Sequence, residues 1–242
     1  MNLLRLLILL AAPPMAFWVV NQNPGHWLRT IIIGTFLLAV FFIFRTASHL
    51  HWMRRVMLPL LLWWSLVGAI IFFDHPVRAL AAAVVTALVL TGYLLQIIHS
   101  PSEQRYLRSA LAVNTLIIFL SANIFYGAIS LLQISVGWMI AGQIILFIIL
   151  TMFIFVNVAP FSPAAIVWLA PLTMIFAELA WAISFLPLQS FATAALAAAV
   201  AVILWAVLII TVMKRWGRRA LILFTVLSVC AILGTLLLAR WL

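Results

Sequence analysis

Three polar side chains stand out in a chain whose long segments are otherwise almost uniformly apolar. Glu178 is the only acidic residue inside any of these segments, and Asn123 and Gln143 lie inside two others. Glu178 precedes the end of its segment at Leu186 by eight residues, which is about 12 Å at the helical rise of about 1.5 Å per residue. Asn123 and Gln143 lie at a similar distance from the corresponding ends of their own segments. The register therefore predicts one polar layer in the outer half of a membrane.

This layer is compatible with two kinds of role. A charged carboxylate is costly in hydrocarbon, and no Lys or Arg lies deep in a segment to pair with it. We therefore expect Glu178 to face protein and to be neutral, hydrogen-bonded or wetted by a cavity. Together with Asn123 and Gln143 it would form a proton or cation site, or a polar substrate pocket. The alternative is that the three side chains make hydrogen bonds that fix helix packing.

The elements that would position these residues are membrane spans. The composition is 69% hydrophobic and 7% charged, and a soluble fold of this composition would leave large apolar patches in water. Blocks of about 20 residues that are apolar on every face predict helices, because a barrel strand needs only about 10 residues of alternating polarity. The chain contains nine such blocks: 3–20, 28–44, 56–73, 79–98, 109–132, 136–158, 164–186, 191–213 and 220–239.

These blocks predict an all-α fold, a polytopic transmembrane helix bundle in which residues 1–242 form a single integral membrane domain without a soluble domain. The first block has the charge and apolar core of a signal peptide, but Pro13 and Pro14 replace the usual small-residue cleavage pattern. We therefore expect an uncleaved anchor, whereas cleavage would leave eight spans. The alanine-rich eighth block predicts close helix packing.

Basic residues fall mainly on one side of the predicted bundle. Ten of the 13 Lys and Arg lie on the side of the N-terminus, and the remaining three lie on the other side. By the positive-inside rule, the N-terminus is cytoplasmic and the C-terminus external. The same charges are expected to face anionic lipid headgroups at the cytoplasmic surface, so we expect no nucleic-acid partner. Besides Arg5, they are Arg45, Arg54, Arg55, Arg105, Arg108, Lys214, Arg215, Arg218 and Arg219.

No pattern typical of a catalytic or metal site rises above this background. His49 and His51 share a basic loop, but that loop has no acidic or thiol ligand beside them, so we expect no metal and no cofactor. Intramembrane protease patterns, a zinc His-Glu-x-x-His motif and a Walker motif are absent from the sequence.

The sequence favours a protein without chemistry of its own. The leading hypothesis is a multi-pass packing or assembly subunit of a membrane complex in a bacterial-type cytoplasmic membrane, with a membrane-protein partner or a homo-oligomer. The alternative is a small transporter or ion carrier that uses Glu178. A third hypothesis is a lipid-handling membrane enzyme, which would need several polar groups at one interface.

Overall fold

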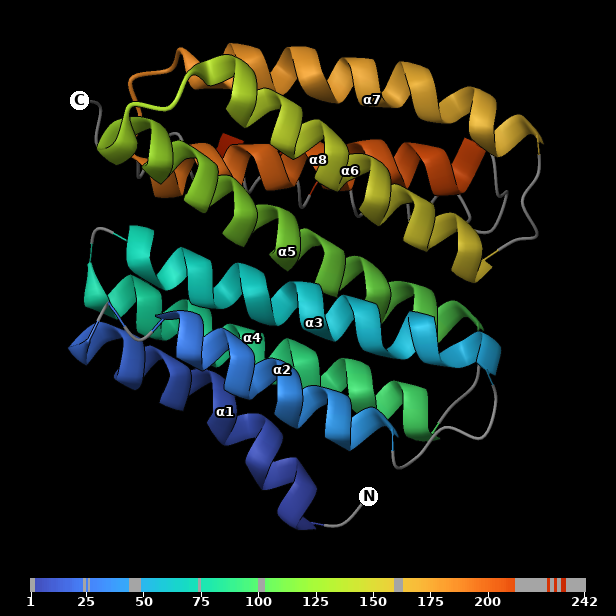
Figure 1. Ribbon diagram of the computed structural model, residues 1–242. Coiled ribbons are helices and arrows are strands. Elements are labelled where there is room, and N and C mark those ends of the chain that lie inside the picture. The colour runs from blue at the N-terminus through green and yellow to red at the C-terminus, as the bar shows by residue number, and fades with distance from the viewer. Residues whose placement is uncertain are drawn as a thin grey trace. The chain divides into compact units, whose positions relative to one another are not determined.

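The computed structural model describes residues 3–23, 25, 27–43, 49–73, 75–99, 103–158 and 163–211, together with positions 226, 229, 232 and 233. Every regular element bounded within these ranges is an α-helix, as the sequence predicts (Figure 1). The helices are α1 (Leu3–Gln22), α2 (Trp27–Ile43), α3 (His49–Phe72), α4 (Pro76–His99), α5 (Glu103–Leu132), α6 (Val136–Val158), α7 (Pro163–Ser184) and α8 (Ser190–Thr211).

Five of the described helices contain a stretch that is long and apolar enough to cross a membrane. These stretches are 76–96, 109–132, 136–154, 167–184 and 190–210, and a shorter apolar helical stretch covers 57–72. They confirm the prediction of helices, and their length and composition suggest a membrane protein. The count of nine spans and the orientation of the two termini stay predictions, and the predicted last span, 220–239, lies outside the described residues apart from four isolated positions.

Local interactions mark the start of α4 and the end of α5. The backbone carbonyl of His75 accepts hydrogen bonds from the N–H groups of Arg78 and Ala79 at 3.0 and 3.3 Å, so His75 caps α4. Pro76 then occupies the first helical position, where its missing N–H has no helical partner to lose. At the end of α5, Gln133 adopts the left-handed conformation, with a φ of 52°, which ends the helix.

The chain divides into two compact units, Met1–Leu120 and Ser121–Leu242, with the boundary inside α5. In the first unit, α1 packs on α3 and α4, and α2 packs on α3. Gly34 of α2 lies so close to the Trp63 ring of α3 that an added Cβ would overlap it. One residue further on in both helices, the Trp64 indole N–H donates to Thr35 Oγ1 at 2.8 Å. A small residue and one hydrogen bond therefore hold α2 against α3.

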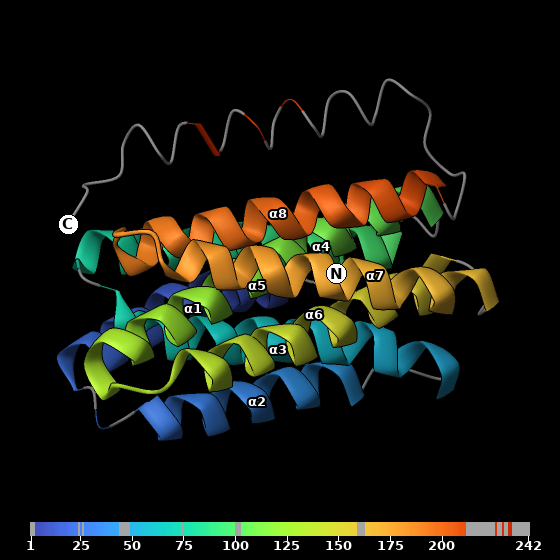
Figure 2. The ribbon, with the colours of Figure 1, turned by 90° about the horizontal axis from the view of Figure 1, so that it is seen from above.

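In the second unit, α7 packs on α6 and on α8, and α7 and α8 run beside each other in Figures 1 and 2. Phe147 of α6 stacks on Phe176 of α7 and on Trp205 of α8, with ring centroids 4.3 and 5.6 Å apart. Three aromatic rings therefore join the three helices at one level.

The alanines of α8 explain how this helix approaches its neighbours. Ala194, Ala197 and Ala201 are spaced three and four residues apart, and they are buried together with Ala198. Their small side chains leave room for the facing backbone, which confirms the close packing expected for this segment.

Candidate functional site

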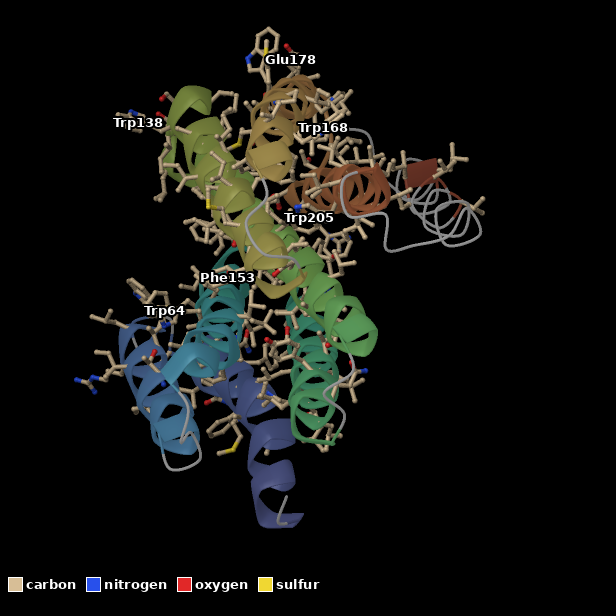
Figure 3. The ribbon with its side chains drawn as sticks, turned by 90° about the vertical axis from the view of Figure 1, so that its right-hand side faces the viewer. Trp64, Trp138, Phe153, Trp168, Glu178 and Trp205 are labelled. Atoms are coloured by element: carbon tan, nitrogen blue, oxygen red, sulfur yellow. The ribbon has the colours of Figure 1, made fainter. Side chains whose placement is uncertain are left out.

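Glu178 lies on the exposed side of α7. The buried face of this helix is formed by Leu172, Phe176, Ala180 and Ile183. Glu178 is two residues from both Phe176 and Ala180, a rotation of about 200° about the helix axis in either direction, which is the opposite face. Its side chain is accordingly exposed, and Figure 3 shows it on the side of α7 that faces away from Trp205.

The sequence predicts that Glu178 faces protein; its side chain is exposed in the described part of the chain, so a protein contact at this position stays a prediction. The inner face of α7 is already filled by the apolar side chains that contact α6 and α8. Since α7 packs through these side chains, its only acidic residue points outward. No described residue forms a hydrogen bond or an ion pair with the Glu178 carboxyl.

The distance of Glu178 from the end of its helix is similar to the predicted one. The apolar stretch of α7 covers 167–184, so Glu178 lies six residues before its end, or about 9 Å at about 1.5 Å per residue. The sequence-based value is about 12 Å because the predicted segment extends to Leu186, whereas the helix ends at Ser184. Glu178 is therefore within the apolar part of the helix on either boundary.

Large apolar side chains surround Glu178 along the same stripe of α7. Met174 precedes it and Trp181 and Phe185 follow it at helical spacing, with exposed fractions of 65, 54 and 65%, and Pro171 continues the stripe toward the N-terminus of the helix. The Trp181 and Phe185 rings meet edge to face, with centroids 5.0 Å apart. We call Pro171, Met174, Glu178, Trp181 and Phe185 the Glu178 face.

Asn123 and Gln143 occupy the opposite environment. Both belong to the second unit, and their exposed fractions are 0 and 2%. The hydroxyl of Tyr126, one turn after Asn123 on α5, donates to the backbone carbonyl of Ala180 on the inner side of α7 at 3.2 Å. The Gln143 amide lies beside this hydroxyl but outside good hydrogen-bond geometry.

The structure thus brings Gln143 and Tyr126 together and keeps Glu178 apart from them. Tyr126 reaches the inner side of α7, while Glu178 lies on its outer side. Tyr126 is not among the site residues predicted from the sequence, although its spacing of three residues from Asn123 on one helix is a signal that the two share a face. A proton or substrate site that combines Glu178 with Asn123 and Gln143 stays a hypothesis, because in the described residues Glu178 lies on the other side of α7 from Tyr126 and Gln143.

Metal chemistry has no support in the part of the chain that the structure describes. No group of three or more His, Cys, Asp and Glu side chains there is arranged to hold a metal ion. The side chains of His49 and His51, and those of Arg45, Arg54, Arg55, Arg105, Arg108, Lys214, Arg215, Arg218 and Arg219, lie outside the described side chains. That these Lys and Arg residues face lipid headgroups therefore stays a prediction.

Comparisons with protein families, with curated proteins and with solved structures find no match for this chain. The arrangement of its own residues is what carries a functional argument. In that arrangement, the exposed Glu178 face and the buried amides of Asn123 and Gln143 are two separate features.

Proposed function

We propose that this protein is an assembly subunit of a complex in the cytoplasmic membrane, and that it binds a transmembrane helix of a different protein on the Glu178 face. The observation that carries the proposal is the exposure of Glu178 within an apolar membrane helix. A purely structural lipid-facing surface needs no carboxyl group at that depth. An interface that selects one partner has a use for such a group, because a single polar side chain in an apolar helix contact determines which helix binds and in which register.

The chemistry of Glu178 defines the partner. On insertion scales, an ionised residue at the centre of a membrane helix costs about 2.5 to 3.5 kcal/mol, and less toward its ends. A Lys or Arg at the matching depth of a partner helix would offset this cost by pairing with Glu178. Two copies related by two-fold symmetry at this face would instead bring two Glu178 carboxyls together, so the partner we propose is a different protein.

The apolar part of the Glu178 face would supply the contact area. Trp181, Phe185 and Met174 are large and exposed, and aromatic and Met side chains are the residue types enriched at interfaces between proteins. Aromatic rings bring contact area with few rotatable bonds, so they lose little conformational freedom on binding. The carboxyl would then select the partner, and the flanking side chains would hold it.

Site-specific photo-crosslinking in native membranes tests this proposal. A photoreactive amino acid at Met174 or Trp181 should crosslink to one membrane protein, and Glu178→Leu should abolish that crosslink. The matched control is Ile145 of α6, which is 59% exposed in the same unit but outside the Glu178 face. Its photoreactive variant should crosslink to lipid.

A charge exchange decides the interpretation of the crosslink. The captured protein should carry a Lys or Arg within a transmembrane helix, and Glu178→Lys should lose the crosslink and regain it when that residue is changed to Glu. A crosslinked dimer of this chain, or a partner without a basic residue in its span, would contradict the proposal. If Glu178→Gln retains the partner but removes a pH-dependent ion flux in proteoliposomes, the carrier hypothesis replaces it.

A further inference from the structure

The buried amides of Asn123 and Gln143 lack protein partners. Neither the oxygen nor the nitrogen of either side-chain amide has a hydrogen-bond partner among the described residues, although both side chains are almost fully buried. Exchanging the oxygen and nitrogen positions of an amide does not remedy this, because both ends are unpaired. More than about 90% of buried polar groups in proteins are hydrogen-bonded, so these four unpaired amide atoms require a partner.

The surroundings of Tyr126 show where such a partner fits. The phenol group donates its proton to the Ala180 carbonyl at 3.2 Å, which leaves the phenol oxygen free to accept a hydrogen bond. The Gln143 amide lies beside this oxygen, and Asn123 lies one turn away on the helix that carries Tyr126. Donors and acceptors from α5, α6 and α7 therefore meet around one buried hydroxyl.

The absence of charged groups around these amides, among the described residues, favours a neutral partner. Asn123, Gln143, Tyr126 and the Ala180 backbone are uncharged groups, and Glu178 points away on the other side of α7. An ion placed here would be desolvated without a counter-charge, which is costly. A molecule that both donates and accepts hydrogen bonds matches amides that offer both, and water is the smallest such molecule.

We propose that Asn123, Gln143 and Tyr126 form a binding site for ordered water, which bridges α5 and α6 and extends to α7 through Tyr126. Buried waters of this kind make two to four hydrogen bonds to polar groups that have no other partner. The site is independent of the Glu178 face, and the partner-binding proposal is not needed for it. Its role is to keep two amides satisfied inside a membrane bundle where no bulk water reaches them.

Water-edited solid-state NMR of the ¹⁵N-labelled full chain in proteoliposomes tests the site. Magnetisation from water should reach the side-chain NH₂ groups of Asn123 and Gln143 several-fold faster than it reaches the indole N–H of Trp205. That N–H is the matched control, because it is fully buried in the same unit and already donates to Thr151 at 2.8 Å. Assignments come from the signals lost in Asn123→Leu and Gln143→Leu.

The leucine variants give a second result that distinguishes water-bound amides from dry ones. If water satisfies the amides, both replacements should lower the melting temperature, since the remaining groups of the site lose a bridging partner. If the amides are dry, removing one should raise it. Amide signals as slow as that of Trp205, or a raised melting temperature in either variant, would overturn the proposal.

Radiolytic hydroxyl labelling of the unmodified protein covers the case in which the variants fail to fold. Water held at the site should yield oxidation of Tyr126, which is buried with 7% of its surface exposed, while Phe147, which is fully buried in the same unit, should remain unmodified. Equal absence of labelling at both rings would contradict a water site.

Discussion

The hydrogen bond between Trp205 and Thr151 allows a quantitative test of how the second unit is held together. Both side chains are fully buried, and the indole N–H of Trp205 in α8 donates to Thr151 Oγ1 in α6 at 2.8 Å. The Thr151 hydroxyl donates in turn to the backbone carbonyl of Phe147 at 2.6 Å. Thr151→Val keeps the branched shape of the side chain but leaves the indole N–H buried without this acceptor.

The expected cost of Thr151→Val lies between two reference values. Leaving a buried donor unpaired costs about 1 to 3 kcal/mol in soluble proteins. Hydrogen bonds between membrane helices average about 0.6 kcal/mol and reach about 1.7 kcal/mol. Because Trp205 is fully buried, we expect a loss of about 1 kcal/mol in the free energy of unfolding.

A double-mutant cycle isolates this hydrogen bond from other effects of the substitution. Thr151→Val should cost about 1 kcal/mol less in a Trp205→Phe background, where no indole N–H remains to be left unpaired. The measurement is reversible unfolding by sodium dodecyl sulfate in mixed micelles, followed by far-ultraviolet circular dichroism. An equal cost of Thr151→Val in both backgrounds would refute the assignment of stability to this hydrogen bond.

Three other predictions concern helix packing, a helix end and topology. Gly34→Val should lower the melting temperature of the protein, because the valine side chain would overlap the Trp63 indole. Gly92→Ala should leave the free energy of unfolding unchanged or raise it by up to about 1 kcal/mol, since an added Cβ at Gly92 meets nothing within 4 Å. Gln133→Gly should stabilise the protein by less than about 1 kcal/mol in the same melting assay, because glycine adopts the left-handed φ of 52° without strain; a lower melting temperature would contradict this reasoning. Reporter fusions after Met213 and after Arg240 should read cytoplasmic and external respectively, and identical readings would exclude the nine-span topology.

The helical and membrane character of the chain could be predicted from its sequence. Apolar blocks of about 20 residues leave a backbone no other way to satisfy its hydrogen bonds in lipid, and this requirement is local to each block. The buried alanines of α8 could be predicted for a similar reason, because residue size alone determines how closely two helices approach. The number of spans is harder to predict from the sequence. Nine apolar blocks are predicted as spans, whereas five of the described helices are both long enough and apolar enough to cross a membrane.

The face on which Glu178 lies could not be predicted. Residues on all sides of α7 are apolar, so hydrophobic periodicity does not indicate which side meets α6 and α8. The distance of Glu178 from the end of its helix depends on chain position alone and could therefore be read to within a few ångströms. Its direction depends on which side chains of α7 fit against Phe147 and Trp205, and this information is held in other helices.

The residues of the candidate sites divide in the same way. The sequence by itself determined that Asn123, Gln143 and Glu178 are polar groups within apolar helices, because residue type and segment length are properties of the chain. Only the tertiary structure decided that the two amides are buried with Tyr126 while the carboxyl is exposed. Burial is a property of packing, and the rotation of each helix about its axis is set by the side chains of the helices that surround it.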